Sequence, residues 1–339
     1  MAILAHWTDS SHLASVSDIG RETSFTYSSF PYCYANFIMY DNLGSTFSLL
    51  KLPTALTTFF LGCYFGAGTG SAVANSQIFT FRNGATDLLA VRVGAVATNC
   101  ELVRWNGATW DVLATVLLTD FMNTTTTHKY AFEITLNNTV GVFKLYRDGI
   151  LVFNFSGDTV GGALTTCDMI RLGAQNTNGG PSGSRCFNPF IADEDTRDIY
   201  CQSMNLTSVV GDLNSWAGSY LDLNEVALGT NAEYDTTTRF SATTDAEFSQ
   251  NIADPTAPFN SGYTVIGVGV HMRAFYTTNP KDVQPLVRRG GVTAYGTQVA
   301  LTPAVRVDFQ MFNLDPATGL AWAYSDLAAV QIGARAKTA

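Results

Sequence analysis

The stretch HKYAFEITLNNTVGVFKLYRDGILVFNFSGDTVGGALTTCDMIRLG, residues 128–173, decides the fold of this chain. Its alternating apolar and polar runs predict three strands and the start of a fourth. Asp148-Gly149 separates two of these runs, and this dipeptide favours a two-residue type I′ hairpin because both central residues need a positive φ. Such a turn would pair Arg147 with Ile150 and Tyr146 with Leu151.

An uninterrupted register along this hairpin fixes the composition of its two faces. One face would carry Val142, Tyr146, Leu151, Phe153 and Phe155, and the other Phe143, Leu145, Ile150 and Val152. Both faces are largely apolar. We therefore expect the hairpin to lie inside a two-layer structure rather than at a half-solvated edge.

The same stretch, together with MIRLG at residues 169–173, resembles the penultimate hairpin of laminin-G-like, concanavalin A-like jelly rolls. In that family an extended strand precedes an LYvDG hairpin and a strand that carries I.LG. The resemblance implies a jelly-roll sandwich. It does not imply one function, because this fold is shared by lectins, glucanases and structural modules.

The composition also favours an all-β chain. Charged residues make up only 14% of the sequence and hydrophobic residues 46%, with abundant Gly, Thr, Asn and Phe and few strong helix formers. The 28 acidic residues exceed the 19 basic ones and give a net charge of −9, which disfavours a nucleic-acid partner because phosphate binding needs clustered Lys and Arg.

The sequence predicts neither a secretory leader nor a membrane span. The start, MAILAHWTDS, lacks a cationic region followed by an apolar core. The uncharged run at residues 52–81 contains Pro53 and several glycines, so it fits two strands better than a spanning helix. In this context the six cysteines are expected as buried free thiols, and a disulfide between Cys186 and Cys201 is the alternative.

The length of 339 residues and the change of composition near residue 204 predict two domains, with one large β-domain as the alternative. Residues 1–204 are predicted to form the jelly roll, with residues 1–30 as an extended lead-in segment. Residues 205–339 are predicted as a polar linker followed by a smaller C-terminal β-sandwich, since strand-like alternation returns after residue 262.

The second half carries another resemblance, through IADEDTRDIY (191–200), VVGDLN (209–214), VIGVGVHMRAFY (265–276) and FNLDPATGLAWAYSDLAAVQIGAR (312–335). These segments are similar to a domain arrangement in structural proteins of tailed bacteriophages, although the usual basic residue after Gly-Asp is missing and AWAY replaces AWT. The resemblance implies a non-enzymatic virion protein, located at the tail tip, in a fibre or as a capsid decoration. Its implied partners are other virion proteins and copies of itself, and it would be made in the bacterial host cytoplasm.

The main acidic run is Asp193-Glu194-Asp195-Thr196-Arg197-Asp198. Its spacing is similar to the E-x-D-x-x-E strand of jelly-roll glucanases, and on a strand Asp193 and Asp195 would share a face. That family uses Glu at both ends and places the motif on a central strand, whereas this run follows the last predicted jelly-roll strand. We therefore expect no enzyme, with a polysaccharide depolymerase as the alternative hypothesis.

The same acids, with Asn176 and Asn178, also offer oxygen ligands of the kind that calcium prefers. No EF-hand spacing is present, so we expect no cofactor, and a calcium site is the alternative.

Glycan recognition is the remaining hypothesis, because jelly rolls bind sugars through aromatic platforms and through Asn or Asp side chains on loops. The candidate ligand-binding residues are Trp105, Trp110, Asn176 and Asn178. The alternative for the two tryptophans is packing within the hairpin or core. A chain of this kind would act as a receptor-recognition adhesin for a host-surface glycan.

Overall fold

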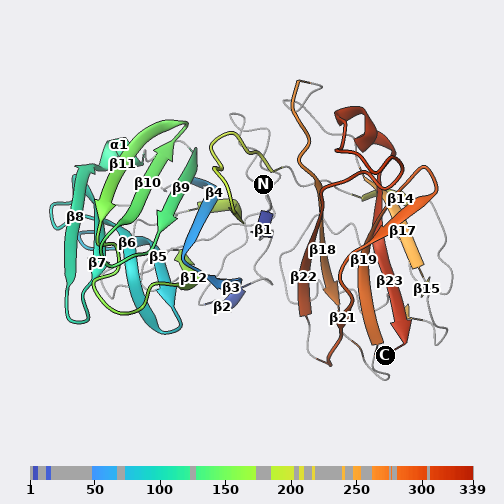
Figure 1. Cartoon of the computed structure of the whole chain (residues 1–339), viewed down its shortest axis with the longest axis horizontal. Coiled ribbons are helices and arrows are strands. Elements are labelled where there is room, and N and C mark those ends of the chain that lie inside the picture. The colour runs from blue at the N-terminus through green and yellow to red at the C-terminus, as the bar shows by residue number, and fades with distance from the viewer. Residues whose placement is uncertain are drawn as a thin grey trace. The chain divides into compact units, whose positions relative to one another are not determined.

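A computed structural model of the 339-residue chain contains two compact units (Figure 1). The structure describes residues 3–6, 13–16, 48–66, 73–122, 127–172, 185–201, 206–209, 216–217, 239–240, 247–252, 262–274, 276, 281–303 and 306–338. Among these, the residues up to Cys201 belong to the first unit and those from Leu206 onward to the second.

The first unit consists of two sheets, in which every strand pairing is antiparallel. In spatial order, sheet 1 contains β1 (Ile3–His6), β13 (Arg185–Ala192), β4 (Thr58–Gly66), β9 (His128–Thr135), β10 (Gly141–Arg147) and β11 (Ile150–Gly157). Sheet 2 contains β2 (Leu13–Val16), β3 (Ser48–Leu56), β12 (Cys167–Leu172), β5 (Gln77–Asn83), β6 (Thr86–Val93), β7 (Asn99–Trp105) and β8 (Trp110–Leu117). One short helix, α1 (Leu118–Phe121), follows β8.

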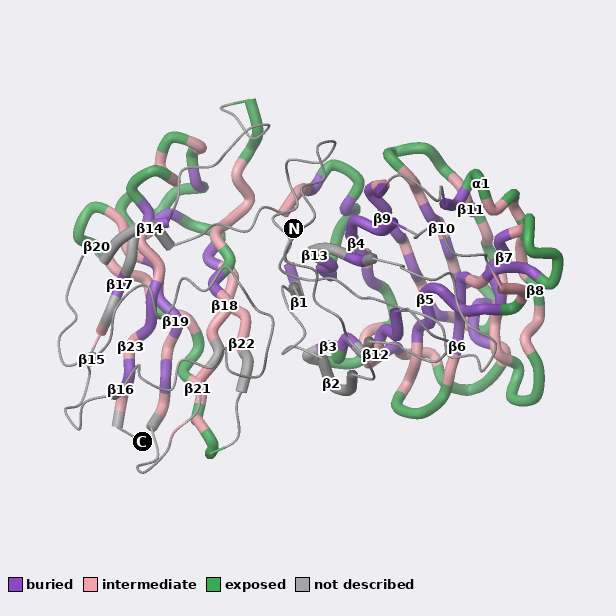
Figure 2. The backbone as a smooth tube through the Cα atoms, turned by 180° about the vertical axis from the view of Figure 1, so that it is seen from behind, coloured by how far each residue is buried: buried purple, intermediate pink, exposed green. Residues whose placement is uncertain are grey.

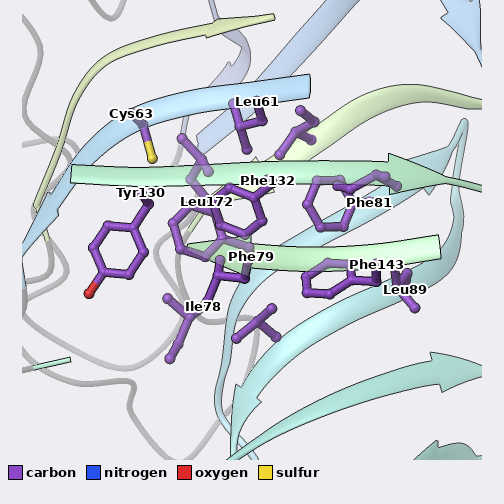
Figure 3. Packing of buried hydrophobic residues seen from close by; sticks show 14 of the residues in the cluster. Leu61, Cys63, Ile78, Phe79, Phe81, Leu89, Tyr130, Phe132, Phe143 and Leu172 are labelled. Atoms are coloured by element: carbon purple, nitrogen blue, oxygen red, sulfur yellow. The ribbon is translucent and has the colours of Figure 1, made fainter. Parts of the chain in front are cut away.

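Aromatic side chains from both sheets meet in a single core (Figure 3). The ring centroids of Phe79 on β5 and Phe132 on β9 lie 5.0 Å apart, and Phe81 on β5 lies 6.3 Å from Phe143 on β10. Figure 2 shows the buried residues concentrated along these strands. Because the contacting rings come from different sheets, the two sheets form a sandwich, and the predicted jelly-roll sandwich is confirmed.

The predicted turn of the central hairpin is also confirmed. Asp148 and Gly149 have φ values of 51° and 79°, and Arg147 pairs with Ile150 and Tyr146 with Leu151. Beyond that point the predicted register is wrong, because a bulge at Val152 pairs Leu145 with Phe153. The extra residue reverses the alternation, so Phe153 joins the core face instead of sharing a face with Leu151.

The predicted position of the hairpin within the sheet is also wrong. Strand β11 is an edge strand of sheet 1, and Ile150 and Leu151 are 70% and 46% exposed. Strand β8, an edge strand of sheet 2, is likewise bulged, at Leu113. A bulge twists an edge strand and hinders pairing with another chain, which is a common protection of exposed edges.

The second unit is a smaller β-sandwich. Its main sheet, sheet 3, contains β14 (Leu206–Val209), β17 (Glu247–Ile252), β23 (Gln331–Thr338), β19 (Lys281–Arg289) and β20 (Val292–Tyr295), with β21 (Val299–Ala300) also paired to β19. Strands β18 (Val268–Ala274) and β22 (Arg306–Phe312) form a separate ribbon, as do β15 (Trp216–Ala217) and β16 (Arg239–Phe240). Val270 and Phe312 of the β18–β22 ribbon share a core with Val287 of sheet 3, which confirms the predicted C-terminal sandwich.

The LDPATGLAW stretch, residues 314–322, forms a tight turn around one buried carboxylate. Asp315 is fully buried and accepts hydrogen bonds from the Ala317 N–H at 3.0 Å and the Thr318 hydroxyl at 2.7 Å. It also accepts one at 2.6 Å from Arg289 of β19. Trp322 completes the turn by donating from Nε1 to the Phe312 carbonyl at 2.8 Å. The 3₁₀ helix η3 (Tyr324–Ala329) follows, and its Asp326 also accepts from Arg289.

Five cysteines lie among the described residues, and all are free thiols. Cys63, Cys100, Cys167 and Cys186 are buried, and Cys201 is half-buried. The described Cys186 and Cys201 are therefore not joined to each other.

Candidate functional site

The structure brings together the two tryptophans that the sequence singled out. Trp105 ends β7, Trp110 begins β8, and the two residues pair directly across the hairpin. Their ring centroids lie 5.5 Å apart with an interplanar angle of 61°, an edge-to-face arrangement. The other two candidates, Asn176 and Asn178, lie outside the described residues.

The tryptophan pair points away from the interior of the sandwich. Leu102 of β7 is in the core, and Arg104 reaches from the same side of the sheet to Asp158 at the end of β11. Because side chains alternate along a strand, Trp105 lies on the outer face with its partner Trp110. Val112 follows on that face and is 50% exposed.

Both tryptophans keep some accessible surface. Each tryptophan is only partly buried, so neither belongs to the closed core. The contact between the two rings is the packing within the hairpin that the alternative expected. In the described part of the chain neither indole N–H of the pair makes a hydrogen bond, whereas Trp322 is buried and donates to a backbone carbonyl. The pair therefore combines residual accessible surface with two indole donors that have no protein acceptor among the described residues.

The turn beside the pair is fixed by Asn106. Its side-chain oxygen accepts from the N–H groups of Ala108 at 3.0 Å and Thr109 at 2.8 Å, and its amide donates to Asp111 at 2.9 Å. Gly107 has a φ of 95°, a conformation that favours glycine, which is why Asn-Gly occupies this turn. The tryptophans thus sit on a turn with one well-defined shape.

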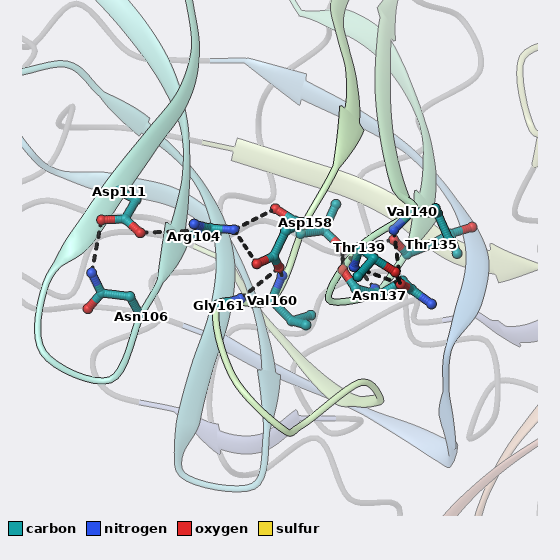
Figure 4. A network of polar contacts seen from close by, with 11 residues as sticks. Arg104, Asn106, Asp111, Thr135, Asn137, Thr139, Val140, Asp158, Val160 and Gly161 are labelled. Atoms are coloured by element: carbon teal, nitrogen blue, oxygen red, sulfur yellow. Dashed lines mark hydrogen bonds and ion pairs between the residues drawn. The ribbon is translucent and has the colours of Figure 1, made fainter.

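Arg104 ties this turn to the other sheet (Figure 4). Its guanidinium contacts Asp111 at 3.3 Å and the Asp158 carboxylate at 2.6 Å. Asp158 in turn accepts from the N–H groups of Val160 and Gly161 at 3.0 and 3.1 Å. Burial alone would raise the pKa of Asp158, but these N–H groups and Arg104 outweigh it and lower the pKa, which keeps the carboxylate charged.

A second set of hydrogen bonds attaches the β9–β10 turn. The buried Thr159 hydroxyl accepts from the Asn137 N–H at 2.9 Å and donates to the Thr135 carbonyl at 3.0 Å. Gly141 is required here because a Cβ at this position would lie 2.2 Å from the Thr159 hydroxyl. The β7–β8 turn, the β9–β10 turn and the segment that follows β11 are therefore held together by these contacts (Figure 4).

The acidic run after β13 does not have the geometry of a paired-carboxylate enzyme. Strand β13 ends at Ala192, so Asp193 and Asp195 are not alternate residues of one strand. Arg197 contacts the Asp195 carboxylate at 2.5 Å, and its N–H donates to the same group at 2.9 Å. Although desolvation opposes it, Arg197 lowers the pKa of Asp195, opposite to the raised pKa of a general acid.

Among the residues that the structure describes, no three His, Cys, Asp or Glu side chains lie close enough together to hold a metal ion. Within that same part of the chain, no helix has the length and apolar character that crossing a membrane requires.

Sequence reasoning missed Lys129, which anchors this acidic segment to sheet 1. Its ammonium donates to the Arg197 carbonyl and lies 3.6 Å from the centre of the Tyr200 ring. Burial lowers the pKa of Lys129 from 10.5 to about 8, even though Asp198, Asp195 and Asp148 oppose this shift. Its hydrogen-bond partner is 68 residues away in the sequence, so no local pattern marks this lysine.

The lowered pKa of Lys129 predicts a specific pH dependence of stability. Between pH 8 and 10.5 the unfolded chain holds this proton more tightly than the folded chain, so stability rises with pH there and is flat below pH 8. The free energy of unfolding of the wild type, relative to Lys129→Met, is expected to rise by up to about 3 kcal/mol between neutral pH and pH 10. Urea denaturation across this pH range measures it.

Lys144→Met is the matched control, since Lys144 pairs with Glu133 at 2.9 Å and its pKa is raised by that contact. The stability that the charged Lys144 adds relative to methionine is expected to be present at neutral pH and to be lost above pH 10.5. A wild-type minus Lys129→Met difference that stayed constant up to pH 10 would contradict the buried-amine assignment.

No protein family and no curated protein sequence matches the chain. Among solved structures it is similar to a Trypanosoma rangeli sialidase, with 10% identity and a TM-score of 0.34 over 47% of this chain and 25% of the sialidase. It is similar to a carbohydrate-binding module from Bacillus subtilis, with 11% identity and a TM-score of 0.31 over 44% of this chain and 84% of the module. A Caenorhabditis elegans galectin shows 7% identity and a TM-score of 0.32 over 46% of this chain and 95% of the galectin.

Proposed function

We propose that this chain is a non-enzymatic protein of a tailed-phage particle and that its N-terminal sandwich binds a glycan at the tryptophan pair. The observation that carries the binding proposal is the partly exposed Trp105–Trp110 pair on turns that are locked by Asn106 and Arg104. The assignment to a phage particle is supported by the resemblance of residues 191–335 to virion proteins.

The chemistry of the pair suits a sugar. The carbon–hydrogen face of a pyranose ring packs against indole surfaces, and the two indole N–H groups can donate to its hydroxyl oxygens. Little conformational entropy is lost on binding, because the turns that carry the rings are already fixed by hydrogen bonds. A rigid aromatic surface can therefore bind an exposed glycan without any rearrangement of the protein.

Replacing either tryptophan is expected to remove most of the binding. The variants Trp105→Ala and Trp110→Ala should each weaken binding to immobilised oligosaccharides by about tenfold or more, as loss of a central aromatic contact does in other interfaces. Biosensor titration of the full chain against a panel of neutral oligosaccharides measures this.

Ile150→Ala is the matched control, since it also removes an exposed apolar side chain, 70% exposed, but at the β10–β11 turn. It should bind as the wild type does. Unchanged binding by both tryptophan variants would overturn the assignment of the site.

The particle assignment has its own test. Gold-labelled antibodies against this chain should decorate intact virions, over the head for a decoration protein or at the distal tail for a receptor-binding one. Absence of label from every particle would overturn the virion proposal and leave the glycan proposal to be judged on its own.

A further inference from the structure

Gly161, in the segment that follows β11, lies unusually close to the backbone of the tryptophan turn. A Cβ at this position would lie 2.6 Å from the Trp105 carbonyl oxygen and 3.0 Å from the Asn106 Cα, whereas nonbonded carbon atoms pack at about 3.5–4.0 Å. Gly161 also has a φ of 53°, in the left-handed region that favours glycine. The segment therefore reaches the Trp105–Asn106 backbone only because residue 161 has no side chain.

The segment that carries Gly161 is itself firmly held. The Asp158 carboxylate accepts from the N–H groups of Val160 at 3.0 Å and Gly161 at 3.1 Å, and the Asp158 carbonyl accepts from Arg104 at 3.1 Å (Figure 4). Val160 is 2% exposed and belongs to the core of the first unit. The segment cannot withdraw without losing these contacts. The β7–β8 turn, which leads into an edge strand of sheet 2, is the part that would have to move.

A displacement of this turn would change the geometry of the tryptophan pair. The Trp105 backbone would have to shift by about 1 Å to restore an ordinary contact with a side chain at residue 161. Trp105 and Trp110 are paired across the hairpin with their ring centroids 5.5 Å apart, so such a shift alters the surface that the two rings share. A binding site that is displaced by about 1 Å loses much of its function.

Building on the proposed glycan function, we propose that Gly161 is a positioning residue of that site. The three atoms nearest to its Cβ position all belong to the backbone of Trp105 and Asn106, so Gly161 acts on a ligand through the tryptophan pair. Its missing side chain lets the segment after β11 support the turn in the conformation that presents both rings.

Gly161→Ala and Gly84→Ala form a matched pair of variants. Gly84 has the same φ of 53°, but a Cβ there would have no atom within 4 Å. Both variants place alanine in a left-handed conformation, and only Gly161→Ala presses a methyl group against the Trp105 carbonyl. Gly162→Ala is a second control, because its Cβ would make an ordinary contact, 3.7 Å from the Val160 carbonyl oxygen.

Two measurements on the full chain follow the expected effect. In the ligand-free protein, Gly161→Ala should shift the indole N–H NMR signals of Trp105 and Trp110 and leave that of buried Trp322 in place. In biosensor titration against the neutral oligosaccharide panel, Gly161→Ala should weaken binding by about tenfold. Both control variants should keep the three indole signals in place and bind within about twofold of the wild type.

A measurement on the wild type covers the case in which Gly161→Ala does not fold. As the oligosaccharide that binds most tightly is added, the backbone N–H signal of Gly161 should shift with the same saturation as the indole signals of Trp105 and Trp110. The backbone N–H signal of Gly84 should stay in place.

The outcomes separate this inference from the proposed function. Wild-type affinity in Gly161→Ala, or an equal loss of affinity in Gly161→Ala and Gly84→Ala, would overturn the positioning role and leave the glycan site intact. A Gly161 N–H signal that stays in place while the indole signals shift would also overturn it. Failure of the wild type to bind any oligosaccharide would overturn the proposed function, and the positioning role with it.

Discussion

Phe132→Ala should lower the free energy of unfolding of the first unit by about 3–5 kcal/mol, the usual effect of truncating a phenylalanine in a packed core. Phe132 is 1% exposed and contacts aromatic rings of both sheets: Phe79 at 5.0 Å, Phe81 at 6.1 Å and Phe143 at 6.1 Å. Its removal leaves a cavity where the two layers meet. Amide hydrogen exchange measures the effect, with faster exchange expected across β5, β9 and β10.

Two controls make this result specific. Ile150→Ala removes an exposed side chain of the same unit and should change stability by about 0.5 kcal/mol or less. Exchange in β19 and β23 of the second unit should be unaffected, since that unit has its own core. A loss of less than about 1 kcal/mol for Phe132→Ala would contradict the packing of the two sheets against each other.

Asp315→Ala is expected to lower the free energy of unfolding of the second unit by about 3 kcal/mol, because it breaks a buried ion pair and leaves polar groups without a partner. Arg289, the Thr318 hydroxyl and the Ala317 N–H would all lose their acceptor. These groups, against the opposing effect of desolvation, lower the pKa of Asp315. Its contribution is therefore present at neutral pH and lost as the pH falls through that lowered pKa.

Hydrogen exchange in β19, β22 and β23 checks this prediction. Thr318→Val removes one of the three donors to Asp315 and should lower the free energy of unfolding by about 1 kcal/mol. This smaller effect is the comparison for Asp315→Ala, which removes the acceptor of all three. If Asp315→Ala were as stable as the wild type, the turn at residues 314–322 would not depend on the buried carboxylate.

Local sequence signals predicted the turn of the central hairpin. They did not predict the bulge at Val152, which shifts the register of the rest of the hairpin by one residue. Asp148-Gly149 encodes its own backbone conformation, so its pairing could be foreseen. The bulge at Val152 could not, because Leu151, Val152 and Phe153 are all apolar and either register buries a plausible set. Strand β11 lies at the edge because no other strand of sheet 1 pairs with its free side. The sequence of β11 itself contains no signal for that position.

The site shows the same division between local and distant signals. Trp105 and Trp110 were predicted as candidates from the sequence, and Asn106-Gly107 is a local turn signal between them, but their pairing across that turn comes from the structure. The link from Arg104 to Asp158 joins residues 54 apart, and the link from Thr159 to Asn137 joins residues 22 apart. Their roles depend on the topology of the two sheets, which bring these turns together.

The most direct test of the tryptophan pair follows the indole N–H signals of the five tryptophans by NMR while a neutral oligosaccharide is added. The probe is the member of the neutral oligosaccharide panel that binds most tightly, and single Trp→Phe variants assign the signals. We expect the signals of Trp105 and Trp110 to shift with saturation while that of buried Trp322 stays in place. Saturable binding that leaves both signals unmoved would contradict the assignment of the glycan site to this pair.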